Sequence, residues 1–206
     1  MNTRKINFIE ATDTLARLDA DWACLIKTVG PCTFDAKRER EPYEALIRAV
    51  AYQQLHSKAG DANIKRLLDL YGGTFPAPAQ LIATEFGMLK ACGFSACKIE
   101  TIHGIAQGAL SGLVPSSLDA DTMTDKQLID RLIKLKGIGQ WTIEMLLIFN
   151  LARLDILPAD DFAIVEGYKR LKKLDVAPKR KEIAQIGACW SPYRTIASWY
   201  LWRVPK

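Results

Sequence analysis

Residues 135–164, LKGIGQWTIEMLLIFNLARLDILPADDFAI, carry the pattern that decides the fold: a Gly-Ile-Gly turn, an apolar helix, and two adjacent aspartates about twenty residues later. The residues before the turn, LIDRLIKL at 128–135, are also apolar at helical spacing, so the turn joins two helices. Two glycines separated by one apolar residue predict a sharp turn that a Cβ would obstruct. We expect Ile138 to point into the core while the amides of Gly137 and Gly139 face outward.

The turn is suited to binding an anion. The helix after it begins at once, so the unpaired N–H groups and the positive dipole end of that helix lie at the turn. This geometry binds a phosphate oxygen without reading a base. Lys134 and Lys136 flank the turn and add positive charge. A plain helix–helix connection explains the same residues, and the short Gly-X-Gly pattern taken alone slightly favours that simpler interpretation.

The aspartates favour the functional interpretation. Asp160 and Asp161 precede FAIVEGYKRL, a helical pattern, so one of them is expected to cap that helix. A carboxylate in that position stays ionised, because the helix dipole and the amides favour its charged form. Two adjacent acids are more than a cap requires. An ionised carboxylate near a phosphate-binding turn is electrostatically unfavourable, unless it stabilises a group that becomes positively charged.

The rest of the chain has the same helical character. Pro42 stands where a first-turn proline would, Ser95 is a candidate N-cap, and Thr124 with Gln127 forms a capping-box pattern. No stretch shows sustained strand alternation between hairpin turns. We therefore expect an all-α protein of about ten short helices.

The composition is that of an ordinary globular protein. The 206 residues are 49% hydrophobic and 25% charged, enough for one core or one core divided between two lobes. No apolar run is long enough to cross a bilayer, and the N-terminus lacks the features of a secretory signal. Five scattered cysteines and two histidines argue against a zinc site and favour reduced thiols. The net charge of +5 permits a polyanionic partner without demanding one.

Residues 135–164 resemble the core of the helix-hairpin-helix DNA glycosylases, in which a hairpin, a helix and an aspartate follow in this order. Further segments resemble the alkylpurine branch of that superfamily, the 3-methyladenine DNA glycosylase II type. These segments are AVAYQQLHSKAG at 49–60, CGFSACKIETIHGIA at 92–106 and WSPYRTIASWYLWR at 190–203. Any one motif is weak, but all of them occur in order with the expected separations, over about residues 40 to 203.

The resemblance implies an all-α fold of two helical lobes with a cleft between them. The central lobe would span about residues 41–155, and residues 1–40 with 156–206 would form the terminal lobe. It also implies hydrolysis of the N-glycosidic bond of an alkylated purine, of the 3-methyladenine or 7-methylguanine type, flipped out of double-stranded DNA in base-excision repair. The chain has no room for the extra N-terminal domain of the larger alkylpurine enzymes and resembles a compact form.

Asp161 matches the catalytic acid of the family, and Asp160 is left for a structural role. An ionised Asp161 would stabilise the positive charge that develops on the deoxyribose and would orient water. Family members that also cleave the strand carry a lysine two residues after the second glycine, where this chain has Trp141, so no Schiff base is expected. The four clustered cysteines of an iron–sulfur cluster are absent. No cofactor is required, although the resemblance allows a monovalent cation on the hairpin carbonyls near Leu135 and Ile138.

The base pocket is expected to be aromatic. A cationic alkylpurine gains roughly 0.5–2 kcal/mol from each good cation–π contact. The residues that match the pocket of the family are Trp141, Met145, Phe162 and Trp202. The bulky residues Trp22, Trp190 and Trp199 are expected in the core instead.

An apolar wedge is expected to fill the hole that a flipped nucleotide leaves in the stack. Leu55 matches the wedge of the family, and its polar neighbours indicate a helix end that faces outward, although leucine is usually a core residue. The complete set of expected DNA contacts is Gln54, Leu55, His56, Lys134, Lys136, Gly137, Gly139 and Thr142.

Two other functions stay open at this point. One is a DNA-binding module that keeps the hairpin but has lost the chemistry, and the other is a glycosylase for a different purine lesion. The expected partner is double-stranded DNA containing alkylated bases, and not a membrane. A monomer is the default, located in the bacterial cytoplasm with the nucleoid or in the nucleus of a eukaryote.

Overall fold

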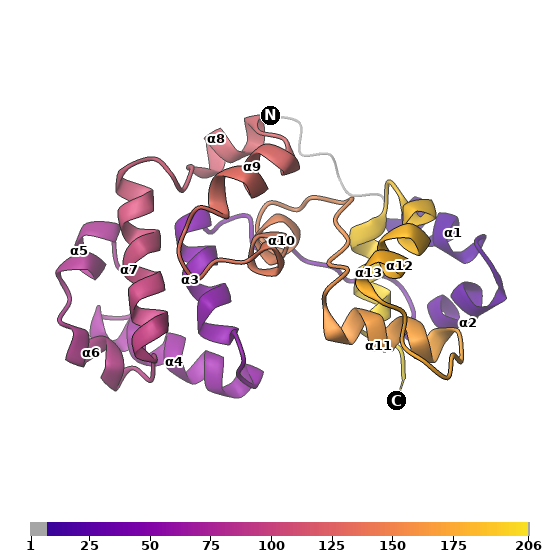
Figure 1. Ribbon diagram of the computed structural model, residues 1–206, viewed down its shortest axis with the longest axis horizontal. Helices are drawn as coiled ribbons and strands as arrows, with labels where there is room; N and C mark the ends of the chain where they lie inside the picture. The colour runs from indigo at the N-terminus through magenta and orange to yellow at the C-terminus, as the bar shows by residue number, and fades with distance from the viewer. Residues whose placement is uncertain (1–7, 206) are drawn as a thin grey trace. The chain divides into compact units, whose positions relative to one another are not determined.

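A computed structural model of the protein describes residues 8–205. Over this range it contains thirteen α-helices, one 3-10 helix and no strand, which confirms the all-α prediction (Figure 1). The described chain divides into two compact units: a central unit of Ala36–Ala152, and a terminal unit formed by the residues up to Asp35 together with those from Arg153 onward. The predicted cleft between two lobes stays a prediction. No helix among the described residues is long and apolar enough to cross a membrane.

The central unit is built on α3. This helix packs against α4, α7 and α10, and the buried side chains recur at three- and four-residue spacing on α3 (Leu46, Ile47, Val50) and α7 (Ile99, Ile102, Ile105). Each fully buried side chain of this size contributes roughly 1.5–3 kcal/mol. The helices are α3 (Pro42–Tyr52), α4 (Ser57–Leu70), α5 (Pro78–Ala83), α6 (Phe86–Ala91), α7 (Ala96–Leu110), α8 (Ser117–Thr122), α9 (Asp125–Leu132) and α10 (Gln140–Phe149).

Helix starts in the central unit follow the sequence signals. The Ser95 hydroxyl accepts from the Lys98 N–H, and Thr124 and Gln127 form the reciprocal capping box ahead of α9. Pro42 lies in the first turn of α3, where its missing N–H costs no helical hydrogen bond. All three predictions of helix starts are therefore confirmed.

The terminal unit is built on α13. Every residue of this helix from Thr195 to Leu201 is buried, and the helix packs against α1, α2 and α11. Trp22 and Trp190 meet edge to face with ring centroids 5.4 Å apart, and Trp199 is also buried, so the three tryptophans predicted for the core are confirmed there. The helices are α1 (Phe8–Ala16), α2 (Ala20–Val29), α11 (Phe162–Leu171), α12 (Arg180–Ile186), the 3-10 helix η1 (Gly187–Trp190) and α13 (Arg194–Leu201).

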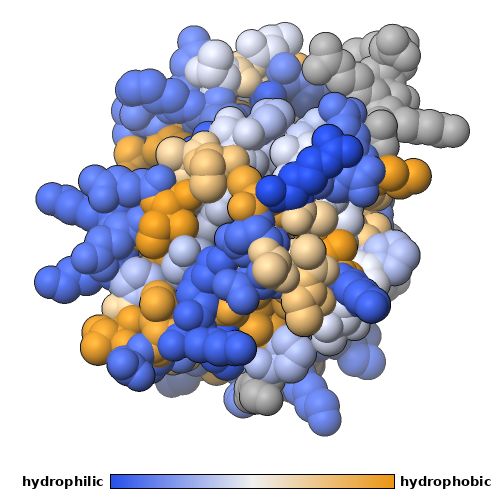
Figure 2. All heavy atoms as spheres, turned by 90° about the vertical axis from the view of Figure 1, so that its right-hand side faces the viewer, coloured by the Kyte–Doolittle hydropathy of each residue, from blue (hydrophilic) through white to orange (hydrophobic). Residues whose placement is uncertain are grey.

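A glycine fixes the approach of α11 to α13. A Cβ on Gly167 would collide with the backbone carbonyl of Leu201, so the two helices touch at a separation that only glycine permits. This contact sets the separation between the middle of α11 and the end of α13. The face of the molecule in Figure 2 is largely hydrophilic, with hydrophobic residues dispersed among the polar ones, as on most protein surfaces.

Candidate active site

The Gly-Ile-Gly turn joins α9 to α10 as the sequence predicts. Ile138 is 4% exposed and its N–H donates to the Leu135 carbonyl at 3.1 Å, while Gly137 and Gly139 are exposed. Gly139 is the N-cap of α10. The isoleucine therefore points inward as expected, and both glycines are exposed, while the outward direction of their amides stays a prediction.

The two glycines of the turn have different reasons to be glycine. Gly137 has a φ of +82°, and a Cβ there would collide with the Thr101 hydroxyl. Gly139 is extended, with φ −95° and ψ 170°, and a Cβ there would have nothing within 4 Å. The prediction that a Cβ is obstructed at both positions is therefore wrong for Gly139. The open space beside it leaves room for a ligand to reach the start of α10.

The two lysines at the turn differ in their partners. Lys136 Nζ lies 2.8 Å from Glu100 Oε2, and this hydrogen bond raises the pKa of Lys136 and lowers the pKa of Glu100. Both side chains are exposed, so the pair contributes little to stability. Lys134 is exposed and has no ion-pair partner within residues 8–205.

Thr142 does not face solvent. Its side chain is 2% exposed, its hydroxyl accepts from Gln53 Nε2 at 2.9 Å, and its N–H donates to the Gly139 carbonyl at 3.0 Å. The expectation of a direct DNA contact is therefore corrected: the hydroxyl ties the turn to the end of α3. Sequence spacing could not show this, because Gln53 lies 89 residues away.

Asp161 is the N-cap of α11 and is bound by a second element. Its Oδ1 accepts from the Ile164 N–H at 3.0 Å and from the indole N–H of Trp202 at 3.0 Å. Asp160 instead pairs with Arg180, with Oδ2 and Nη1 2.7 Å apart, and both side chains are about half exposed. Of the two acids, the one matched to catalysis is thus also the cap, and it is oriented by a tryptophan that follows α13 directly.

The segment that leads to the aspartates is fastened to the start of α13. The Asp155 carboxylate accepts from Arg194 Nε at 2.7 Å, from Arg194 Nη2 at 2.9 Å and from the Ser191 hydroxyl at 2.8 Å. Burial alone would raise the pKa of Asp155, but these hydrogen bonds lower it below its usual value. Thr195 Oγ1 donates to the Arg153 carbonyl at 2.7 Å and accepts from the Ile156 N–H at 3.1 Å. One helix therefore fixes both the approach to Asp161 and its indole partner.

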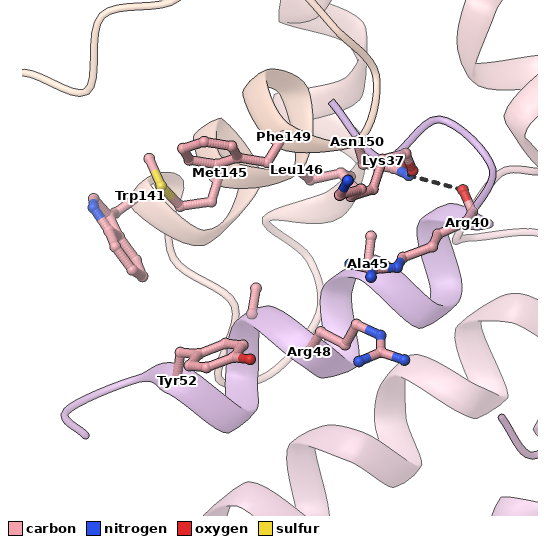
Figure 3. A pocket seen from close by; sticks show the side chains of 11 residues that line it. Lys37, Arg40, Ala45, Arg48, Tyr52, Trp141, Met145, Leu146, Phe149 and Asn150 are labelled. Carbon is pink, nitrogen blue, oxygen red and sulfur yellow. Dashed lines mark hydrogen bonds between the residues drawn. The ribbon is translucent and has the colours of Figure 1, made fainter. Parts of the chain in front are cut away.

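A cavity of about 280 Å³ lies between α3 and α10 in the central unit. Trp141, Met145 and Phe149, one helical turn apart on α10, face Tyr52 and Arg48 of α3 across it (Figure 3). This volume is below the roughly 300–1,000 Å³ of pockets for drug-sized ligands, and it suits a compact planar group.

Sequence reasoning found Trp141 and Met145 but missed the rest of this lining. The three-residue stripe 141, 145 and 149 is visible as helical spacing, so Phe149 could have been found. Tyr52 and Arg48 lie on another helix and had no such signal. Lys37 and Arg40 also line the cavity, and Arg48 is paired with Glu44, Nε to Oε1, at 2.7 Å.

The other two predicted pocket residues belong to the terminal unit, next to Asp161. The Phe162 side chain is 78% exposed and follows the aspartate directly. Trp202 is half-buried and donates to Asp161, so it orients the carboxylate, a role the sequence did not reveal.

The predicted wedge lies in a short loop between α3 and α4. Leu55 is 43% exposed, and Gln54 before it has a φ of +55°, unusual for a residue other than glycine. Gln54 and His56 are exposed as well. Leu55 is thus not a core leucine, which keeps the wedge interpretation open.

Residues 8–205 contain no group of three or more His, Cys, Asp or Glu side chains that could hold a metal ion.

Known proteins resemble this chain along most of its length. A family model described as HhH-GPD superfamily base excision DNA repair protein matches residues 47–192. DNA-3-methyladenine glycosylase 1 of Schizosaccharomyces pombe is 44% identical over 194 residues, covering 93% of this chain and 85% of that protein. The alkylbase DNA glycosidase-like protein mag2 of the same organism is 39% identical over 202 residues, covering 97% and 95%. A solved structure of the S. pombe 3-methyladenine DNA glycosylase in complex with abasic DNA matches with a TM-score of 0.90 at 43% identity, over 94% of this chain and 95% of that one.

Proposed function

The chain belongs to the HhH-GPD superfamily of base excision DNA repair proteins, and we propose that it is a monofunctional DNA-3-methyladenine glycosylase that excises alkylated purines from duplex DNA. The observation that carries the proposal is Asp161: a carboxylate at a helix N-terminus, held by both a backbone amide and an indole N–H. A simple cap needs only the amide. The hydrogen bond from the indole fixes the orientation of the carboxylate. A catalytic carboxylate needs a fixed orientation, because its charge must lie close to the reacting atom.

The chemistry follows from that fixed charge. When the bond between the base and C1′ breaks, the electron pair leaves with the purine, neutralising an alkylated cationic base, and positive charge develops on the deoxyribose. Asp161 stabilises this charge, and such preorganised electrostatic contributions are typically worth about 2.7–4 kcal/mol. Water then adds to C1′ and loses a proton, giving an abasic site and the free base. A cationic base is already a good leaving group, so no strong general acid is needed.

The hairpin and the loop around Leu55 supply DNA binding. In this proposal, the exposed Lys134, Lys136 and the amides at Gly137 and Gly139 contact backbone phosphate, and the exposed Leu55 fills the hole left by the flipped nucleotide. Trp141 and Met145 would line the base pocket. A monovalent cation on the carbonyls near Leu135 and Ile138 would add positive charge beside a phosphate, and the Leu135 carbonyl, which accepts from the Ile138 N–H, has a second lone pair to offer it.

A second candidate is a glycosylase for an uncharged purine lesion. Lys37, Arg40 and Arg48 line the same cavity as Trp141, and Arg40 and Arg48 share the Glu44 carboxylate, with Nε to Oε1 distances of 3.8 Å and 2.7 Å. Positive charge around the cavity disfavours a cationic base, whereas stacking on Trp141 serves neutral and cationic purines alike.

A panel of defined lesion duplexes separates these candidates. We expect release of 3-methyladenine and 7-methylguanine under single-turnover conditions. Release of ethenoadenine or hypoxanthine alone would favour the second candidate. Binding without release of any base would identify a DNA-binding module instead.

A further inference from the structure

Lys98 of α7 holds the end of the helix that precedes Leu55. Its Nζ donates to the Ala51 carbonyl at 3.1 Å and to the Gln53 carbonyl at 2.8 Å. Because α3 ends at Tyr52, these carbonyls have no following turn of helix to bond with. An ammonium at this end also meets the negative end of the helix dipole. Lys98 therefore fixes the backbone on both sides of the last helical residue.

The burial of Lys98 shows that this arrangement is specific. The side chain is half-buried, burial lowers its pKa, and no carboxylate pairs with it within residues 8–205. A lysine on a helix surface ordinarily keeps its ammonium in water. Here the ammonium gives up part of its hydration for two backbone carbonyls, so it has replaced water as their donor.

Gln53 ties the same loop to the hairpin. Its side-chain Nε2 donates to Thr142 Oγ1 at 2.9 Å and lies 3.5 Å from the Gly137 carbonyl. The main chain of Gln53 is thus held by α7 while its side chain is held by the phosphate-binding turn. Both contacts lie inside the central unit.

The loop held in this way is conformationally unfavourable. Gln54 has a φ of +55°, which costs an L-residue of order 1–3 kcal/mol unless its surroundings enforce it. A third contact ties together the helices on either side of the loop, since the Tyr52 hydroxyl at the end of α3 donates to Asp61 of α4 at 2.5 Å. The backbone is thus fixed from three elements, while the Leu55 side chain is left 43% exposed.

We propose that Lys98 and Gln53 are positioning residues that hold the loop of residues 53–56 in register with the hairpin, so that Leu55 enters the base stack at a set distance from the phosphate bound at Gly137–Gly139. Neither residue needs to touch DNA, because both act through Leu55. The proposal rests on the proposed function, since it assumes that Leu55 is the wedge. Phosphate binding and base flipping are then coupled through the Gln53 side chain.

The test compares excision of the same alkylated base from duplex and from single-stranded DNA. Lys98→Met keeps the length of the stem and removes the donors. A displaced wedge should slow single-turnover excision from duplex by up to about 10²-fold, as misplacements near 1 Å do. Excision from single strands should stay near the wild-type rate, because a single strand has no stack to open. Lys98→Arg, which keeps the donors, should recover part of the duplex rate.

Two further variants complete the design. Lys90→Met, at an exposed lysine of α6, removes the same charge from the same unit and should leave the duplex-to-single-strand ratio unchanged. Thr142→Val removes the acceptor of Gln53 at nearly constant volume and should lower the ratio in the same direction as Lys98→Met. It keeps the proposal testable if Lys98→Met does not fold.

The wedge itself supplies the decisive comparison. In a Leu55→Ala background, Lys98→Met should cause little further loss of the ratio, because the side chain it positions is gone. Equal losses on both substrates, or a loss as large with Leu55→Ala as without it, would overturn the positioning role. If the wild-type protein releases no base from either substrate, the proposed function has failed. Normal wild-type release with an unchanged ratio in Lys98→Met and Thr142→Val would overturn this inference alone.

Discussion

Trp202→Phe isolates the indole hydrogen bond to Asp161. The substitution keeps an aromatic ring but removes the N–H that donates to Oδ1 at 3.0 Å, while the amide of Ile164 still caps from the other side. A hydrogen bond to a charged group is worth about 1.5–3 kcal/mol, which corresponds to a fall of roughly 10- to 100-fold in rate if the bond serves the transition state. The carboxylate stays in place, but its direction is no longer fixed.

Single-turnover excision from a methylated duplex measures this effect directly. If Trp202 orients Asp161, the maximal rate falls while the affinity for the damaged duplex is nearly unchanged. If Trp202 is only a wall of the base pocket, affinity for the lesion falls and the maximal rate is preserved. Trp199→Phe, at a buried tryptophan of α13, the helix that Trp202 directly follows, is the matched control and should lower thermal stability with little effect on rate. A full maximal rate in Trp202→Phe would refute the orienting role.

Three other outcomes are expected. Gly137→Ala should lower the free energy of unfolding by about 2–4 kcal/mol, because of its positive φ and the collision with Thr101. Gly139→Ala should leave the melting temperature unchanged and weaken binding to all duplexes alike. Equal melting temperatures in the two variants would contradict the difference between the two glycines. Leu55→Ala, at a side chain that is 43% exposed, should slow excision from duplex far more than from single strands, and equal slowing on both substrates would contradict the wedge role. With Trp141 in place of lysine, borohydride should trap no covalent protein–DNA adduct, and the abasic strand should stay intact until alkali is added.

The helices and their starts were predictable from sequence because the signals are local. Thr124 and Gln127 lie three residues apart, and Ile138 lies between two glycines that frame it. The same local reasoning correctly assigned Trp22 and Trp190 to the core.

The details of the site were less predictable because they depend on contacts between distant segments. Gly139 lies two residues after Gly137 in the motif, yet only a Cβ on Gly137 would meet Thr101 of α7. The Thr142 hydroxyl is bound by Gln53, the residue that follows α3, and Asp161 gains its second donor from Trp202, 41 residues further on. The spacing of residues within one segment does not show which residue of a distant segment will contact it.

Asp161→Asn tests the central claim, that the charge of this carboxylate performs the chemistry. Asn keeps an oxygen for the Ile164 and Trp202 donors and caps a helix about as well as Asp, so thermal stability should change little. A unit charge at about 4 Å and an effective dielectric constant near 20 is worth about 4 kcal/mol, so single-turnover excision should fall by about 10² to 10³ while duplex binding persists. Asp160→Asn, which breaks only an exposed ion pair with Arg180, should be milder. A near-wild-type rate in Asp161→Asn with a severe loss in Asp160→Asn would show that the other acid is catalytic, and near-wild-type rates in both would contradict the catalytic account.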